Sequence, residues 1–210
     1  QFAGGTGTKS DPYQITTAAE LNTVRDYLDK HYKLMNSIDL TNYLSEGGDG
    51  YASWGTAGWL PIGDATNKFT GSFDGNGKLI NNLTINRPTQ DYVGLFGYYQ
   101  PTTQGDSIKN LGLKDVEITG QNYTGSIIGL SSLANITQCF SSGSVSGKGY
   151  VGGIAGRMTG ANSTSRNELT NTYSSCYVYA ITSSVGGIVG QTLYMHLKNC
   201  FSSGKINSSL

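Results

Sequence analysis

Few residues of this chain have types and spacing that could do chemistry. The two histidines, His31 and His196, lie far apart and have no neighbouring Glu or Cys, so the H-E-x-x-H spacing of a zinc peptidase is absent. The sequence also lacks a G-x-S-x-G nucleophile elbow, a phosphate-binding loop and a C-x-x-C pair. We therefore predict no catalytic residue, no metal site and no cofactor.

A repeat reveals the elements that must position the remaining side chains. The phrase I-K-N-L-G-L recurs in related forms that begin at Ile80, Ile108, Ile136, Leu169 and Leu197. The intervals are 28, 28, 33 and 28 residues. Units of this length bury their apolar faces only by stacking on their neighbours. Because the units are short β-rich runs interrupted by Gly and Asn, without apolar residues at helical spacing, we predict stacked parallel strands in an all-β fold.

Three columns follow from aligning the five copies. The starting residues form one apolar column, and a second, apolar or small, contains Leu83, Leu111, Cys139, Thr172 and Cys200. Both are predicted to point into the core of a parallel β-helix, a solenoid. Between them runs an amide column of Asn82, Asn110, Gln138, Asn171 and Asn199. Amides stacked at every coil can bond to one another and to the backbone at a bend, so we interpret this column as a structural ladder.

The three cysteines are predicted to be free and buried. Cys139 and Cys200 share a column but lie two coils apart. At about 4.8 Å per coil, their separation is roughly 9.6 Å. A disulfide requires Cα atoms within about 7 Å.

A helix is predicted over residues 17–31, before the regular coils. Thr17 and Glu20 form a capping box, and Leu21, Val24 and Leu28 lie on one helical face. We expect this amphipathic helix to cap the first coil, with His31 as a cation at its C-terminal end. The chain is thereby divided into an N-terminal cap with irregular first coils, residues 1–79, and regular coils of about 28 residues, 80–210.

A second, glycine-rich phrase marks another strand of each coil. It reads Y-V-G-L-F-G at Tyr92, Y-T-G-S-I-I-G at Tyr123, Y-V-G-G-I-A-G at Tyr150 and S-V-G-G-I-V-G at Ser184. Upstream lie G-W-L-P-I-G and F-T-G-S-F-D-G-N-G-K-L-I-N-N-L-T-I, and residues 5–15 near the start of the chain read G-T-G-T-K-S-D-P-Y-Q-I. Together these phrases resemble the GLUG-motif family of bacterial surface proteins over nearly the whole chain.

The resemblance implies a right-handed parallel β-helix on a cell surface. Members include adhesins, cell-wall-anchored surface proteins and non-catalytic N-terminal regions of immunoglobulin A1-cleaving metallopeptidases. No catalytic residue is carried over, because the shared motif consists of Gly, Asn and apolar residues.

Composition agrees with a surface location. The 14 basic and 14 acidic residues balance, and charged residues make up 13% of the chain, about half the ~25% of an average globular protein. Without a basic cluster, nucleic acid is not expected as a partner. No apolar run is long enough to span a membrane. We expect an extracellular, cell-surface protein.

Aromatic residues are the best candidates for binding. They recur at equivalent positions of successive coils, in Tyr92, Tyr123 and Tyr150 and in Phe140, Tyr173 and Phe201. Exposed rings could stack on sugars or contact a host or cell-surface protein. The alternative is that loops cover them.

The sequence therefore predicts a non-catalytic extracellular adhesion or display module that binds glycans or proteins. The alternative is a carbohydrate-active domain, a polysaccharide lyase or glycoside hydrolase, built on the same coils. Such enzymes need paired carboxylates or a calcium cluster on one face. The acidic residues that lie nearest one another are Glu46, Asp49, Asp64 and Asp74. We interpret them as turn and loop residues.

The fifth coil, which starts at Leu197, has no second glycine-rich phrase and no polar cap. Terminal repeats of stacked folds need such a cap. We expect this chain to be part of a larger polypeptide.

Overall fold

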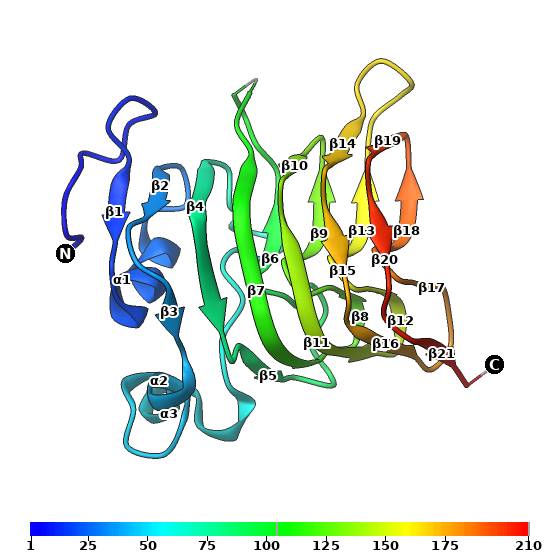
Figure 1. Ribbon diagram of the computed structural model, residues 1–210, viewed down its shortest axis with the longest axis horizontal. Helices are drawn as coiled ribbons and strands as arrows, with labels where there is room; N and C mark the ends of the chain where they lie inside the picture. Colours follow the sequence, from blue (N-terminus) through cyan, green and yellow to red (C-terminus); the bar gives the residue numbers. More distant parts are fainter. Residues whose placement is uncertain (104, 210) are drawn as a thin grey trace.

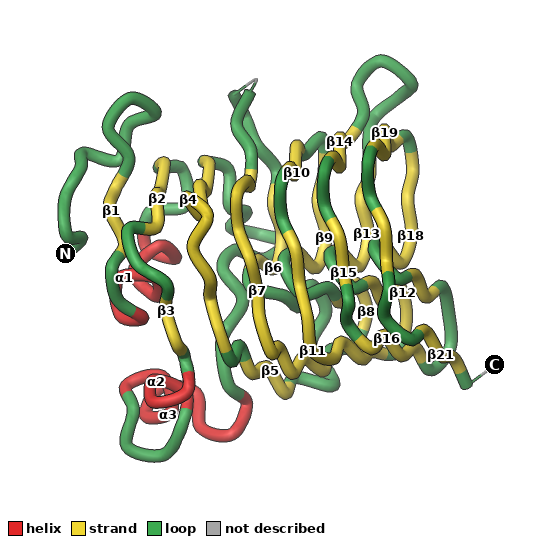
Figure 2. Tube along the Cα trace, in the orientation of Figure 1, coloured by secondary structure: helices red, strands yellow, loops and turns green. Residues whose placement is uncertain are grey.

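In the computed structural model, which describes residues 1–103 and 105–209, the chain winds repeatedly through three sheets (Figures 1 and 2). Every pairing between its named strands is parallel, and the partners come from successive passes of the chain. A pass through the sheets is called a coil below. This is a β-helix-like all-β fold.

The largest sheet has fourteen strands. Its main row runs through β1 (Tyr13–Ile15), β2 (His31–Leu34), β4 (Ser72–Asn81), β7 (Ile108–Thr119), β10 (Asn135–Thr137), β14 (Asn167–Thr170) and β19 (Met195–Lys198). The others are β3 (Ile38–Asp39), β5 (Thr84–Asn86), β11 (Phe140–Gly147), β15 (Tyr173–Ser174), β16 (Tyr177–Ala180), β20 (Phe201–Ser202) and β21 (Ile206–Ser208).

Two smaller sheets complete the coil. One contains β8 (Asn122–Thr124), β12 (Gly149–Gly152) and β17 (Val185–Gly186). The other contains β6 (Phe96–Tyr99), β9 (Ile128–Ser132), β13 (Ala155–Thr159) and β18 (Val189–Leu193). The glycine-rich phrases lie in and between these strands, as second strands of the coil.

The register corrects the first copy of the repeat. Ile108 pairs with Ile136 and with Phe73, whereas Ile80 pairs with Leu113, in the second half of β7. The phrase I-N-N-L-T-I thus corresponds to L-K-D-V-E-I, and β5 continues that register along β7. The column prediction was wrong for residues 80–83, which include Asn82 and Leu83. A register shift in β4 between Asp74 and Lys78 separates the two halves of the strand. The phrase I-N-N-L-T-I resembles the sequences of both halves of β7, so the sequence alone did not choose the correct register.

The helix prediction was correct at its start and wrong at its end. The helix α1 spans Ala18–Thr23, the 3-10 helix η1 spans Val24–Asp26, and the capping box of Thr17 and Glu20 is present. The predicted helix extended to His31, but the helical turns end at Asp26, and His31 begins β2, which pairs with β1 and β4. Pairing on both sides outweighs the weak helical preference of this segment. Along the chain, the helix therefore belongs to the first coil and connects β1 to β2. Its Leu21 and the adjoining Val24 are fully buried.

The N-terminal edge of the main sheet is covered by the chain itself. The Gln14 backbone N–H donates to the Gly4 carbonyl oxygen at 2.8 Å, and the Ala3 N–H donates to the Gln14 carbonyl oxygen at 3.1 Å. The ring of Phe2 stacks on Tyr13, with centroids 4.4 Å apart. The outer backbone groups of β1 are thus partly satisfied.

The opposite end of the coils is open. Leu197 pairs with Leu169, which is fully buried, but Leu197 itself is 47% exposed because no described strand lies beyond β19. Phe201 of β20 is 58% exposed, and Ile206 of β21 is also exposed. The last coil thus exposes Leu197 and Ile206, whose partners Leu169 and Val178 are buried, beside unpaired strand edges.

The remaining helices are short: α2 (Thr41–Leu44), α3 (Asp49–Trp54) and the 3-10 helix η2 (Gly55–Ala57). No helix in the described residues has the length and apolar character needed to cross a membrane.

The one long interval of the repeat, 33 residues, reflects a loop between β13 and β14. Residues 161–166 are exposed, and this loop projects beyond the ends of the strands (Figure 1, yellow). The Asn162 side-chain oxygen accepts the backbone N–H groups of Thr164 and Ser165, which closes the turn.

Candidate functional site

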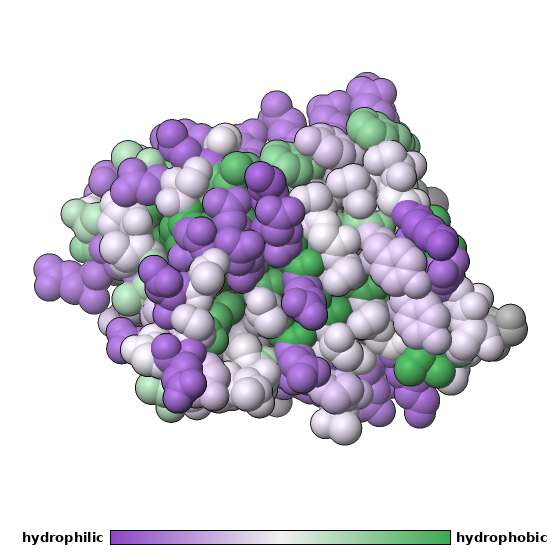
Figure 3. Space-filling model, turned by 60° about the horizontal axis from the view of Figure 1, so that its bottom comes forward, coloured by the Kyte–Doolittle hydropathy of each residue, from purple (hydrophilic) through white to green (hydrophobic). Residues whose placement is uncertain are grey.

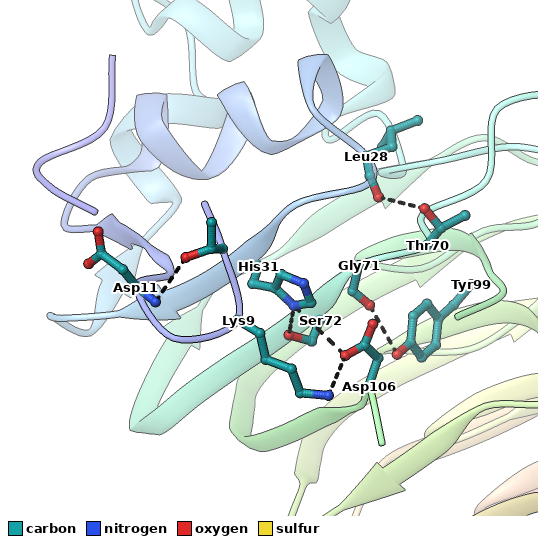
Figure 4. Close-up of polar contacts among 10 residues, drawn as sticks. Lys9, Asp11, Leu28, His31, Thr70, Gly71, Ser72, Tyr99 and Asp106 are labelled. Atoms are coloured by element: carbon teal, nitrogen blue, oxygen red, sulfur yellow. Dashed lines mark hydrogen bonds and ion pairs between the residues drawn. The ribbon is translucent and has the colours of Figure 1, made fainter. Parts of the chain in front are cut away.

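A Ser, a His and an Asp meet at the N-terminal ends of neighbouring strands of the main sheet (Figure 4). His31 begins β2 and pairs in register with Ser72, the first residue of β4, while Asp106 precedes β7. His31 Nδ1 lies 2.7 Å from Ser72 Oγ and 3.9 Å from Asp106 Oδ1. Lys9 Nζ donates to the same Asp106 oxygen at 2.9 Å, and Asp106 is buried.

This arrangement is not that of a serine nucleophile with its base. In a catalytic triad the serine contacts Nε2 of the histidine and the carboxylate contacts Nδ1. Here both Ser72 and Asp106 face Nδ1, and Lys9 already pairs with the carboxylate. The cluster ties the N-terminal loop to the segment before β7. His31 is therefore a strand residue, and its predicted place at a helix end was wrong.

One aromatic column follows the glycine-rich phrases. The rings of Tyr92, Tyr123 and Tyr150 stack with centroids 5.2 Å apart and planes within 8° of parallel. The far face of Tyr92 is covered by Tyr98, at 5.8 Å. All three column residues have φ between 54° and 60°, the left-handed region.

The other aromatic column lies on the main sheet. Phe140, Tyr173 and Phe201 pair in register on β11, β15 and β20. Their centroids are 5.1 Å apart and their planes lie 4° from parallel. Exposure rises along the column, from half-buried Phe140 to the open Phe201.

The stacking determines what these columns can bind. A ring that recognises sugar does so through its face, but each inner ring already has its faces against rings of neighbouring coils. The columns therefore present ring edges and phenolic hydroxyls to solvent. Apolar residues seen from below (Figure 3) are scattered among hydrophilic ones on that face.

The amide column begins with bonds to carboxylates. Asn110 Nδ2 donates to Asp74 Oδ1 at 3.0 Å, and Asn82, in its separate register, donates to Asp39 Oδ1 at 3.0 Å. Asp39 has a lowered pKa, because the Thr41 hydroxyl, the Asn82 amide and the Thr41 backbone N–H bond to its charged form. Both amides are only partly buried.

Amide-to-amide bonding occurs at the other end of the column. Asn199 Nδ2 donates to Asn171 Oδ1 at 3.0 Å, and both side chains are exposed. The Gln138 side chain makes no hydrogen bond to another described residue. The expected continuous ladder is thus replaced by separate surface contacts at the bends of the coils.

All three cysteines are free, and their surroundings differ. Cys139 and Cys176 are buried, and desolvation raises the pKa of the Cys139 thiol to about 12. Cys200, in the open last coil, is only partly buried.

The acidic residues considered for an enzyme do not form one cluster. Asp64 Oδ1 accepts the N–H groups of Thr66 and Asn67, whereas Asp74 bonds to Asn110 and to the Asn76 N–H. Among the described residues, no group of three His, Cys, Asp or Glu side chains is arranged to hold a metal ion.

Comparison with known proteins places these features in context. The GLUG motif matches residues 181–207. A "Putative Gly-rich membrane protein" of Evansella cellulosilytica is 45% identical over 120 residues, 56% of this chain and 13% of that protein. "Halomucin" of Haloquadratum walsbyi is 33% identical over 162 residues, 74% of this chain and 2% of that protein. The chain thus spans a small part of these relatives' lengths.

A solved structure shares the fold. The crystal structure of a putative immunoglobulin A1 protease from Bacteroides ovatus superimposes with a TM-score of 0.70 at 18% identity, covering 99% of this chain and 80% of that chain. At this identity the likeness concerns the fold alone. Together with the motif match, it confirms the resemblance that the repeated glycine phrases indicated.

Proposed function

From the premise that this chain carries the GLUG motif on a β-helix-like fold, we propose that it is a non-catalytic adhesion and display segment of an extracellular surface protein. The observation that carries the proposal is the regular presentation of aromatic edges. Rings repeat every 5.1 to 5.2 Å along two columns of partly exposed side chains. Such a surface gives many equivalent weak contacts to a glycan or a protein.

The relatives support the surface location, since one is named a membrane protein, and both are far longer than this chain. We propose that the chain acts within a longer polypeptide of that kind. Its coils are right-handed, α1 shields the apolar core of the first coil, and the irregular part, residues 1–79, forms a unit distinct from the regular coils of 80–210.

The alternative, a carbohydrate-active domain, has one observation in its favour. Asp26 and Asp64 line the same groove, of about 520 Å³. Paired carboxylates are what glycosidic cleavage requires. The two functions differ in whether bound sugar is released.

A glycan array combined with reducing-sugar release on common polysaccharides distinguishes them. We expect binding without release from the 210-residue chain. Tyr173→Ala and Phe201→Ala, which remove two rings of one column, are expected to weaken attachment to host or environmental surfaces. Sugar release that exceeds the background of heat-denatured protein would contradict the non-catalytic function.

A further inference from the structure

A groove between η1 and the loop of residues 60–67 is a concave feature that the aromatic columns do not explain. Its volume is about 520 Å³, within the ~300–1,000 Å³ typical of small-molecule sites. Leu28, Leu60 and Pro61 supply apolar lining, and the polar groups come from Arg25, Asp26, Asp64, Asn67 and Gln90. Residues from three separate parts of the chain thus converge on one concave site.

A half-buried arginine holds one wall of the groove in place. Arg25 donates through NH2 to the Leu60 carbonyl oxygen at 2.9 Å and through NH1 to the Pro61 carbonyl oxygen at 3.3 Å. Its guanidinium lies 5.1 Å from the ring centres of both Trp54 and Trp59. Burial lowers the pKa of Arg25 to about 10, so it stays charged at neutral pH.

This anchoring matters for binding because a preformed wall needs no ordering when the ligand arrives. The third donor, Nε of Arg25, bonds to Asn22 at 2.6 Å. Three of the five guanidinium N–H groups thus bond to protein acceptors, and the guanidinium itself lines the groove.

The polar groups of the groove, in contrast, have free bonding capacity. Neither the Asp26 carboxylate nor the Asn67 side-chain amide bonds to another described residue, and both side chains are exposed. The Asp64 contacts to its turn use Oδ1, which leaves Oδ2. Carboxylates accept and amides both donate and accept, the combination that fits neighbouring hydroxyls.

The charge of the groove selects among ligands that carry hydroxyls. Asp26 and Asp64 place two negative charges on its lining, against the single positive charge of Arg25, whose guanidinium bonds to Asn22, Leu60 and Pro61. The lining thus carries a net negative charge, which disfavours an anionic sugar relative to a neutral one. We propose that this groove binds an uncharged hexose unit of a glycan, with the apolar face of the sugar on Leu28 and Leu60 and its hydroxyls on Asp26 and Asn67.

The inference rests on the proposed adhesion function and locates the sugar away from the aromatic columns. The inner rings of those columns have covered faces, whereas the groove offers both an apolar lining and free acceptors.

The test measures binding of the 210-residue chain to neutral and to uronic- or sialic-acid-containing glycans on an array, followed by calorimetry with the best neutral oligosaccharide. Asp26→Ala and Asn67→Ala are each expected to weaken binding at least tenfold without a change in melting temperature. Asp29→Ala is the matched control, because Asp29 is exposed near η1, pairs with Lys30 and does not line the groove.

The outcomes separate the site from the function. Unchanged binding in both groove variants, a preference for acidic glycans, or no neutral glycan bound at all overturns the site. If the Asp26→Ala and Asn67→Ala variants still bind glycan but the Tyr173→Ala variant does not, the adhesion function stands and the groove is not the binding site. If the wild-type chain releases sugar and the groove variants do not, the site stands and the non-catalytic function is wrong.

Discussion

Single residues in the left-handed backbone region form the bends of every regular coil. Asn110, Gln138, Asn171 and Asn199 have φ between 49° and 54°. This region costs a typical L-residue roughly 1–2 kcal/mol, and Asn is tolerated because its short amide bonds locally. The amide column therefore exists chiefly because of backbone geometry, and hydrogen bonds between amides are secondary.

Asn110→Ala is expected to lower the free energy of unfolding by about 1–3 kcal/mol. The change removes the bond to the Asp74 carboxylate and leaves Ala at a φ of 53°. Asn110→Gly loses the same bond without the backbone strain, so its loss should be smaller. Urea unfolding of both variants measures the difference. A loss below ~0.5 kcal/mol for Ala, the range of ordinary surface changes, would contradict the role of Asn110 at the bend.

The sequence was sufficient to identify this column from Asn110 onward, because identical types recur at constant register. It misplaced Asn82, since the I-N-N-L-T-I phrase fits two registers and only the pairing with β7 chooses between them. The His31–Ser72–Asp106 cluster could not be predicted from any local sequence pattern either. Its residues come from three coils, and only the fold brings them together.

At the scale of elements, glycine permits the close approach of strands in successive coils. A Cβ on Gly156, in β13, would lie 2.4 Å from the backbone of Tyr123 and Thr124. The neighbouring strand cannot move without disturbing the stacked tyrosines. At Gly149, in β12, the nearest atoms are side chains of Asn122 and Ser183, both at 3.1 Å.

Gly156→Ala is accordingly expected to destabilise the protein by about 1–3 kcal/mol, the usual cost of overpacking. Gly149→Ala should be nearly neutral, because side chains can adjust. Thermal unfolding compares the two variants. Equal melting temperatures would show that the glycine-rich phrase does not serve close packing.

The strands themselves were predictable from short β-rich runs and glycine phrases. The end of α1 was not, because Leu28 continues the apolar spacing of the helix, yet the helical turns end at Asp26 and the following strand β2 is stabilised by β1 and β4. Tertiary pairing, absent from any local pattern, decides such segments.

For the whole molecule, the two ends of the coil stack differ. The first strand is covered by residues 3 and 4, while the last coil leaves Leu197 and Phe201 exposed beside unpaired strand edges. Open edges with apolar side chains favour association.

We expect the 210-residue chain to self-associate with rising concentration through this open end. Sedimentation velocity should show dimers that disappear in the double variant Leu197→Lys, Phe201→Lys. Met35→Lys, an exposed position on the N-terminal side, is the control and should leave association unchanged. A wild-type chain that remains monomeric at every concentration would contradict the expectation.

The loop of residues 161–166 shows that the pairing of strands in successive coils does not depend on the length of the chain that connects them. Five additional residues enter between β13 and β14, yet Leu169 still pairs with Ile136 and then with Leu197. A peptide grafted at this turn would be held away from the strands, on a base whose spacing stays constant. Insertions of different length can therefore be accommodated there while the strand register of the coils stays the same.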